Sequence, residues 1–465
     1  MARYRLSRSS LTTVARRAMS VALAGLLLGL LATAPARALN LLQAYQAALA
    51  SDPVFAAARA QYQAATERLP QARAMLLPWL SATTSATYAD TRTRYTNDQP
   101  TRRTHGDTYV YRLVLSQPLF DWSSWKSYEA AQLILAQSEL QLQRAHQDLL
   151  LRVAQAYFDV LAAEDTLTAL LAERASIVEQ LASAKRNFEL GTATITDTYE
   201  AQARYDLVQA QLLQAENTLA IRRDALEQII GQPATRLSAL PPEAVIPPPE
   251  PARVDAWVDR AQSDNIDVVV ARLATAIADK NIEIARAGHY PTVDLVADFS
   301  HTNSPHRPEA AQAAFGPGRA HARGSSVGVQ VSIPLYTGGY TSARVNEAVA
   351  LQSQSRSSYE NARRQATHAA RESFFRVVSG LAQIRALEAG EQSSRKALEA
   401  NQTGYELGVR INLDVLNSQQ QLYATQRDLA QARYDTLMAG LRLKAAAGLL
   451  SESDIETVNR MLREN

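Results

Sequence analysis

The segment FELGTATITD at residues 188–197 returns as YELGVRINLD at residues 405–414, and this recurrence decides the fold class. The same spacing of 217 residues separates Gly231 from Gly448. Nearly the same spacing separates SQPLF at 116–120 from SIPLY, which begins at Ser332. A period of this length indicates two duplicated domains rather than a solenoid of short repeats.

Each half of the chain contains two long stretches with the residue pattern of a coiled coil. Apolar residues step by four and three along helices expected at about 122–190 and 194–230, as in Leu149, Val153, Ala156 and Val160. Residues 123–190 include no proline and no glycine, so one helix there would be on the order of 100 Å long. The second half predicts a matching pair at about 338–407 and 411–447.

Two segments ahead of each helix pair alternate apolar and polar residues, as strands with one apolar face do. They lie at about 79–90, 108–118, 291–301 and 325–334. Each is roughly 9–11 residues long, the length that a tilted strand needs to cross a bilayer. The segments within each strand pair, 90–107 and 301–323, are polar and contain Gly or Pro. We therefore expect them to be exposed loops.

The number of strands predicts the oligomeric state. Four strands cannot close a barrel around a pore, whereas three copies would supply about twelve, an even number in the range of known barrels. Closure would also hide the edge strands. The predicted fold is an internally duplicated α+β membrane protein with four barrel strands and long coiled-coil helical hairpins per protomer. Its trimer would form a 12-stranded β-barrel on a 12-helix α-barrel.

The first 38 residues have the composition of an export signal. Five arginines precede an apolar run at 21–32, and small residues lead up to Ala38. Cleavage after Ala38 would remove six arginines and leave 42 Lys and Arg against 46 Asp and Glu, a net charge of −4. No basic surface for nucleic acid is then expected. The alternative is an uncleaved N-terminal anchor.

The cysteine count also bears on the class of protein. The chain has no cysteine, so we expect packing rather than disulfides to stabilise it, and no N-terminal lipid anchor. The expected organisation is a signal at 1–38, a first repeat at 39–231, a Pro-rich linker at 232–252, a second repeat at 253–450 and a tail at 451–465.

Together with AQAYFDVLAAED at 154–165, the duplicated segments resemble the TolC family of outer-membrane efflux and secretion channels. The resemblance covers residues 39–450. It is nearer to the type I secretion branch than to the lipid-anchored drug-efflux branch. A haemolysin- or cyclolysin-exporting member of the CyaE kind fits, as does a general efflux member. It implies a barrel in the outer membrane, a helical tunnel in the periplasm, and an equatorial belt built from residues 231–260 and 451–465.

The resemblance also implies partners and excludes a chemical reaction. A homotrimer would conduct substrates passively, together with a periplasmic adaptor (a membrane fusion protein) and an inner-membrane ABC transporter or proton-driven pump. The family has no enzyme activity, and we expect no cofactor. No catalytic triad, Walker loop or HExxH motif occurs in the sequence. His301, His306 and His321 share one polar segment, which favours an exposed loop over a metal site.

A pore constriction is implied at the start of the last long helix. Asp414 would place one carboxylate per chain around the axis, where like charges attract cations. Asn417 stands where a second acid is usual in the family, so we expect a less acidic mouth. The alternative for Asp414 is an acid that the helix dipole favours at a helix N-terminus.

A latch is implied between the two helical turns. Tyr405 and Arg410 would pair with Thr196 and Asp197 and hold the mouth shut, through bonds that can be exchanged for a partner's. The alternative is a solvated surface pair of little energy.

Gly191 and Gly408 mark the tips of the two hairpins. Glycine supplies the left-handed turn after a helix, and the resemblance adds docking of the adaptor at both tips.

Two other kinds of protein also carry long helical hairpins. A periplasmic adaptor has one hairpin flanked by lipoyl-like modules, and a structural spacer has no pore. Two hairpins, each preceded by two strands of barrel length, favour the channel.

Overall fold

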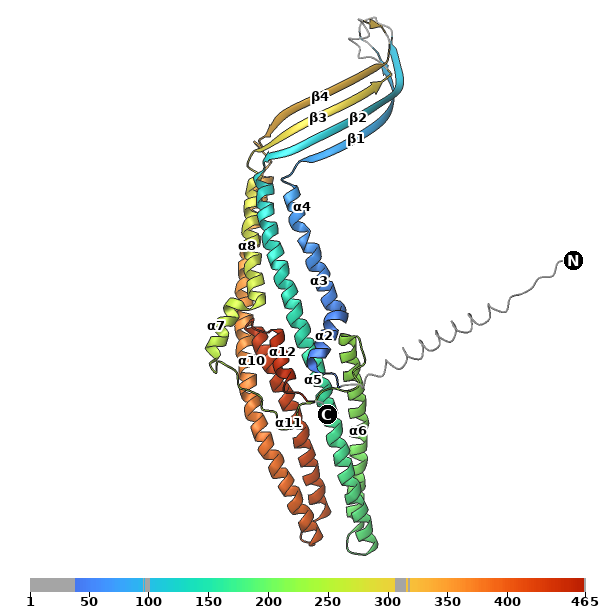
Figure 1. Ribbon diagram of the computed structural model, residues 1–465, viewed down its shortest axis with the longest axis vertical. Helices are drawn as coiled ribbons and strands as arrows, with labels where there is room; N and C mark the ends of the chain where they lie inside the picture. The colour runs from blue at the N-terminus through green and yellow to red at the C-terminus, as the bar shows by residue number, and fades with distance from the viewer. Residues whose placement is uncertain (1–37, 95, 97–100, 306–314, 317, 464–465) are drawn as a thin grey trace, which may run out of the picture.

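The computed structural model describes residues 38–94, 96, 101–305, 315, 316 and 318–463, so the predicted export signal lies outside the described residues. The predicted protomer of four strands and two long helical hairpins is confirmed (Figure 1). The elements are α2 (Leu41–Ser51), α3 (Pro53–Thr66), α4 (Arg68–Ala74), β1 (Trp79–Thr93), β2 (Arg102–Phe120), α5 (Trp122–Glu189), α6 (Ile195–Ile230), α7 (Val254–Asp264), α8 (Ile266–Ala287), β3 (Thr292–Ser304), β4 (Ala320–Ser332), α10 (Tyr340–Glu406), α11 (Asn412–Ala446) and α12 (Glu452–Asn459).

Both strand pairs extend further than the alternation of apolar residues predicts. β2 begins at Arg102 rather than near 108, and β4 begins at Ala320 rather than near 325. The expectation of loops across 90–107 and 301–323 is therefore wrong at their ends. Backbone hydrogen bonds need no apolar side chain, so the strand pairing continues into polar sequence. His301 and His321 consequently lie on strands, while His306 is outside the described residues.

The four strands form one antiparallel sheet in the order β1-β2-β3-β4. β2 pairs with β3 although α5, α6, α7 and α8 lie between them in the chain, so the sheet joins the two repeats. The register shifts between Pro118 and Phe120, because proline has no N–H to donate to the ladder. None of the described helices is long and apolar enough to cross a membrane.

The long helices begin and end at identifiable signals. Asp121 caps α5, its carboxylate accepting from the backbone N–H groups of Ser123 and Ser124 at 2.9 and 3.2 Å. α5 then runs for 68 residues and α10 for 67. At the tips, Gly191 and Gly408 have φ of 76° and 75°, a left-handed conformation in which other residues are strained.

Apolar side chains hold each hairpin together. Between α5 and α6 the buried residues are Leu170, Ile177, Val208 and Leu212, and between α10 and α11 they are Leu398, Val415 and Leu422. This is the seam that the 3.5-residue repeat predicts.

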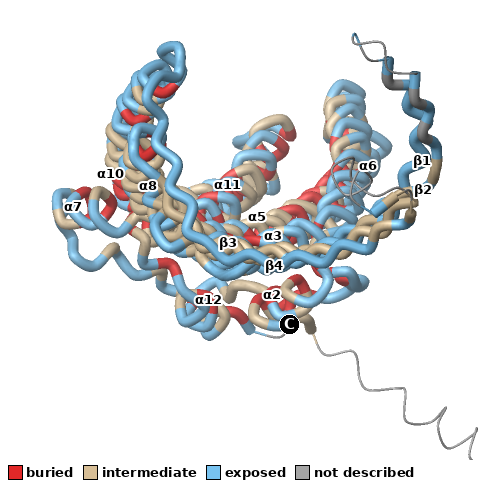
Figure 2. The backbone as a smooth tube through the Cα atoms, turned by 90° about the horizontal axis from the view of Figure 1, so that it is seen from above, coloured by how far each residue is buried: buried red, intermediate tan, exposed pale blue. Residues whose placement is uncertain are grey.

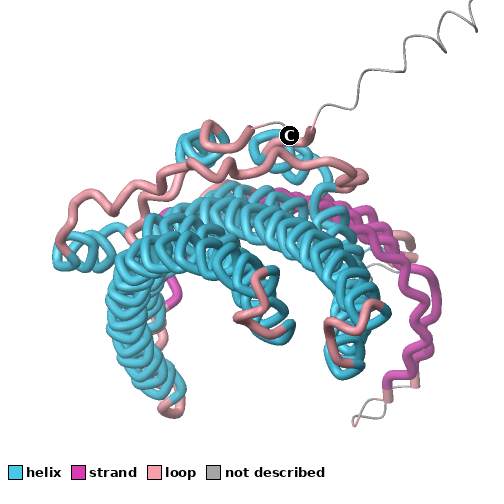
Figure 3. The backbone as a smooth tube through the Cα atoms, turned by 90° about the horizontal axis from the view of Figure 1, so that it is seen from below, coloured by secondary structure: helices cyan, strands magenta, loops and turns pink. Residues whose placement is uncertain are grey.

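The largest apolar cluster lies at the waist of the molecule, where α2, α5, α6, α11 and α12 meet. Tyr157 is fully buried, and its hydroxyl hydrogen is shared between the carbonyls of Leu39 and Ser238, both at 2.9 Å. The linker pairs with the first and the last part of the described chain through the bridges Leu39–Leu237 and Ala239–Arg463. The long helices form a curved layer, seen from above in Figure 2 and from below in Figure 3. Figure 2 shows α2, α7 and α12 on the convex side of this layer.

A glycine allows α10 and α11 to approach closely. A Cβ on Gly380 would lie 2.3 Å from Oγ1 of Thr436 and 3.2 Å from its Cβ. Thr436 is 2% exposed, and its hydroxyl donates to the carbonyl of Ala432 at 2.7 Å. The threonine is therefore fixed against the glycine.

Gly380→Ala should lower the stability of the protein by about 1–3 kcal/mol, because overpacking outweighs the ~0.5–1 kcal/mol gained in helix propensity. Heat-induced unfolding of the purified protein measures the change. Thr436→Ala in the same chain should restore most of the loss. Gly390→Ala is the matched control, since the nearest atom would lie 3.7 Å away in ordinary contact. Equal losses at 380 and 390 would contradict this packing account.

Candidate functional site

A cleft of about 800 Å³ separates the tips of the two hairpins. The residues that line it come from both repeats and include Asp197, Tyr405, Gly408 and Arg410. Gly191 lies at the tip of the first hairpin, and Thr196 follows in the first turn of α6. The structure thus brings most of the expected gate residues to one place.

Within the protomer, three of the expected latch residues contact other partners, and the latch itself stays a prediction. Asp197 accepts from the hydroxyl and the N–H of Thr194 at 2.8 and 2.9 Å and closes a capping box at the start of α6. Arg410 is 3.6 Å from the carboxylate of Asp414, and the hydroxyl of Tyr405 accepts from the side chain of Asn187 at 3.3 Å. Asp197 and Arg410 thus contact residues three and four positions away in the sequence. Tyr405 contacts a residue of the facing helix α5.

The two residues of the expected constriction have different surroundings. Asp414 is an acid in the first turn of α11, with its side chain 37% exposed beside Arg410. Asn417 accepts from the guanidinium of Arg204 on α6 at 3.0 Å. Asn417 therefore links the two hairpins. Their arrangement as a ring around a pore requires three copies and stays a prediction.

Asn412 is a contact residue that the sequence interpretation missed. It is fully buried at the start of α11. Its side-chain oxygen accepts from Gln180 on α5 at 2.5 Å, and its NH₂ group donates to the carbonyl of Asp197 at 2.9 Å. The equivalent position in the first repeat, 217 residues earlier, is Ile195. This difference between the repeats was a signal available in the sequence.

Asn412 belongs to a series of polar contacts between α5 and the second hairpin, most of them with α11. Four side chains on α5, spaced seven or eight residues apart, each bond to a residue of the second hairpin. We call these pairs the polar ladder: Asp165–Tyr434 at 2.8 Å, Glu173–Arg427 at 2.9 Å, Gln180–Asn412 at 2.5 Å and Asn187–Tyr405 at 3.3 Å. A spacing of seven residues returns to the same face of a long helix.

The duplication makes the polar ladder specific to one repeat. The four α5 positions correspond, 217 residues later, to Ala382, Gly390, Ala397 and Gly404 on α10. Small apolar residues therefore replace all four polar side chains. The face of α5 that contacts the second hairpin is therefore polar, whereas the equivalent positions of α10 carry only alanine and glycine.

The polar ladder contains one ion pair, Glu173–Arg427, in which the glutamate is the more deeply buried partner. The side chain of Glu173 is 2% exposed and that of Arg427 is 22% exposed. Burial raises the pKa of Glu173, while its bond to Arg427 opposes the rise. Burial likewise raises the pKa of Asp165, opposed by the hydroxyl of Tyr434. Such groups stabilise the structure only while their partners are present.

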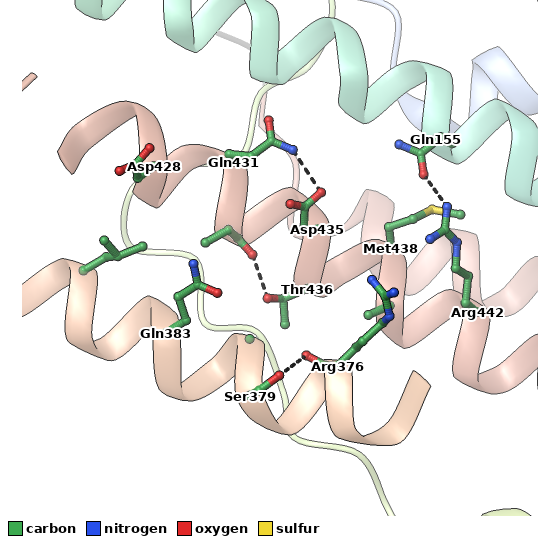
Figure 4. A pocket seen from close by; sticks show the side chains of 14 residues that line it. Gln155, Arg376, Ser379, Gln383, Asp428, Gln431, Asp435, Thr436, Met438 and Arg442 are labelled. Atoms are coloured by element: carbon green, nitrogen blue, oxygen red, sulfur yellow. Dashed lines mark hydrogen bonds between the residues drawn. The ribbon is translucent and has the colours of Figure 1, made fainter. Parts of the chain in front are cut away.

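A second cleft, of about 460 Å³, lies where α10, α11 and Gln155 of α5 meet (Figure 4). Its lining is polar: Arg442 donates to Gln155 at 2.8 Å, and Gln431 donates to Asp435 at 2.9 Å. Arg376 and Asp428 contribute further charges. Among the described residues no group of three His, Cys, Asp or Glu is placed to hold a metal ion. Polar and charged side chains line most of both clefts, so both clefts are suited to holding water.

A four-stranded antiparallel sheet carried on two long helical hairpins is the protomer fold of an outer-membrane channel. A family model described as "Outer membrane efflux protein" matches residues 44–232 and 257–449, and the chain belongs to that family. It is a family of channels, not enzymes. Membership places the protein in the outer membrane, with its helices extending into the periplasm.

Individual relatives match most of the chain. Outer membrane protein TolC of Vibrio cholerae is 33% identical over 91% of this chain and 94% of its own length. Alkaline protease secretion protein AprF of Pseudomonas aeruginosa is 34% identical over 90% of this chain and 87% of its own. The crystal structure of the outer membrane protein VceC from Vibrio cholerae aligns with a TM-score of 0.74 over 88% of this chain and 96% of its own, at 22% identity, which indicates a shared fold.

Asn412→Ala should raise the single-channel conductance of the protein in planar lipid bilayers. The change removes two bonds between the hairpins and leaves Gln180 and a carbonyl unpaired, at about 1–3 kcal/mol for each group. Asn401→Ala is the matched control, because Asn401 donates to Ser418 at 2.6 Å inside one hairpin. An unchanged conductance for Asn412→Ala, or an equal rise for both, would rule out the seam as the closing contact.

Arg427→Met should destabilise the protein by about 3–5 kcal/mol near neutral pH, because it leaves the Glu173 carboxylate buried and unpaired. Burial raises the pKa of Glu173, so the folded variant binds this proton more readily than the unfolded chain does. Stability is therefore regained as pH falls toward the ordinary glutamate value and lost as pH rises through the raised pKa.

Thermal unfolding of this variant at pH 5 and pH 7.5 measures the difference. Glu173→Gln is the control, since it keeps a hydrogen-bonding group without a charge and should show no such pH dependence. A loss in Arg427→Met that stays constant between the two pH values would contradict the burial argument.

Proposed function

We propose that three copies of this chain form the outer-membrane exit duct of a type I secretion system and conduct protein substrates from the periplasm to the exterior. The observation that carries this proposal is the match to AprF, a relative named for the secretion of a protease, across nine-tenths of the chain. The duct is passive, and its energy comes from an inner-membrane ABC transporter.

The free edges of the sheet support the trimer. β1 and β4 are the outer strands of a sheet that does not close within the protomer. Three protomers joined β4 to β1 would satisfy both edges and supply about twelve strands, within the known range for such barrels.

Exposed apolar side chains at the hairpin tips support docking of a periplasmic adaptor. Leu190 is 72% exposed, Leu407 is 73% exposed and Val409 is 76% exposed. No Cβ contact within 4 Å would arise at Gly191 or Gly408, so the tips are open to a partner. Clustered apolar side chains on a surface mark sites of protein interaction.

A drug-efflux duct that serves a proton-driven pump is the second candidate. The family description, "Outer membrane efflux protein", favours it. The two candidates share the duct and differ in the pump and in the substrate.

Deletion of the gene that encodes this chain distinguishes a secretion duct from a drug-efflux duct. For the secretion duct, we expect one or more proteins to disappear from the culture medium and to return when the gene is restored, with drug susceptibility unchanged. Hypersensitivity to small toxic compounds with intact protein secretion would overturn the proposal in favour of drug efflux.

Gly408→Trp should abolish export while leaving trimers intact. A bulky side chain cannot adopt a φ of 75° without strain, and it would fill the surface on which the adaptor is proposed to dock. Secretion assays and gel filtration of the purified protein measure the two effects. Gly316→Trp is the control, because Gly316 also has a positive φ but lies between β3 and β4, away from the tips. Normal export by Gly408→Trp would contradict docking at this tip.

A further inference from the structure

One face of the sheet is apolar over the half nearest the helices. The strand pairing places Val327 of β4 beside Ala297 of β3, and Ala297 beside Leu115 of β2. Two residues along, Val329 lies beside Leu295. Val327 and Val329 are 76% and 61% exposed. Residues two apart on a strand share a face, so this is the face that a barrel turns toward lipid.

The same face becomes basic toward the end of the sheet that is farther from the helices. Arg323 of β4 lies beside His301 of β3, and His301 lies beside Tyr111 of β2. Two residues further, His321 lies beside Asn303. The change from apolar to basic therefore occurs along one continuous face of β3 and β4.

Both histidine rings are held against the sheet. Nδ1 of His321 donates to the side-chain oxygen of Asn303 at 2.5 Å, which leaves Nε2 available for another group. The ring of His301 stacks on Tyr111 with 6.3 Å between centroids and 26° between planes. The side chain of Arg323 has no hydrogen-bond or ion-pair partner among the described residues, and neither does the side chain of Arg319, which directly precedes β4.

The carboxylates on this face of the sheet do not pair with the arginines at the outer end of β4. Asp90 on β1 is already bound by Arg103, at 3.0 and 2.5 Å. Asp107 lies on β2, two strands away from β4. The outer part of β3 and β4 is thus positively charged. We call Arg319, His321, Arg323 and His301 the basic band.

The height of the basic band matches the edge of the hydrocarbon. Ten residues separate Arg323 from Ile333 on the same face, which is about 33 Å along a strand. At a tilt of about 40° this spans ~25 Å, the height of the apolar band on such barrels. The basic band lies at the end of the sheet away from the helices (Figure 1). Because the helices extend into the periplasm, this end is level with the head groups of the outer leaflet.

We propose that the basic band binds the phosphate groups of the glycolipid that forms the outer leaflet. Arginine presents a planar fork of donors that matches phosphate oxygens. The apolar face below packs against the acyl chains of the same lipid. This proposal depends on the outer-membrane placement and is independent of what the duct conducts.

Native mass spectrometry of the detergent-purified protein tests the proposal, with lipid A, dephosphorylated lipid A and phosphatidylglycerol as probes. The wild-type protein should retain lipid A, and loss of the phosphates should weaken retention by about tenfold or more, as expected for lost charge-assisted contacts. Arg319→Gln with Arg323→Gln should cause a similar loss, and Arg323→Lys should restore part of it in the Arg319→Gln background.

Arg371 is an exposed arginine on α10 that makes no ion pair with any described residue. Arg371→Gln is therefore the matched control and should retain lipid A as the wild type does. The oligomeric mass recorded in the same spectra shows whether each variant assembles. Equal retention by the double glutamine variant, or equal retention of dephosphorylated lipid A, would overturn the proposal. Phosphatidylglycerol bound as tightly as lipid A would also overturn it, because the site would then recognise charge alone.

Discussion

The constraint on which the rest of the structure depends is the open edge of the sheet. β1 and β4 each carry a row of backbone N–H and C=O groups that the protomer cannot satisfy. In hydrocarbon each unpaired group costs several kcal/mol, and only closed pairing removes that cost. A chain with four strands must therefore associate with copies of itself. The association carries the helices with it, since α5 and α10 follow directly on β2 and β4.

Toward the tips, the contacts within each helical hairpin are apolar, whereas the polar ladder joins one hairpin to the other. Within each hairpin, leucine, isoleucine and valine pack in a continuous apolar contact. Between the hairpins, the polar ladder joins α5 to α11 through bonds such as Glu173–Arg427. Polar bonds can be exchanged for water or for a partner with little net loss, whereas buried apolar surface cannot. Toward the tips, movement of one hairpin past the other is therefore expected to be easier than separation of the helices within a hairpin, whereas at the waist an apolar cluster holds both hairpins together.

Much of the fold follows from the sequence because its signals are local and repeated. The coiled-coil period over α5, the alternation in β3 and the glycines at the tips each predict their element without knowledge of the rest. The ends of β2 and β4 were missed, because strand pairing there continues through polar residues whose side chains give no alternation.

The site was less predictable for a different reason. A family resemblance implies a latch between Asp197 and Arg410, whereas within the protomer these residues contact Thr194 and Asp414. Asn412 and Glu173 could have been found by comparing the two repeats, since their equivalents are Ile195 and Gly390. Which side of α5 meets α11 is a property of the packed hairpins, and no local pattern reports it.

Copies of the same chain are expected to satisfy the edges of the sheet. The native mass of the protein, released from the outer membrane in mild detergent, tests this closure. We expect one dominant species with the mass of three mature chains. A dominant monomer, or an assembly with another number of chains, would contradict it.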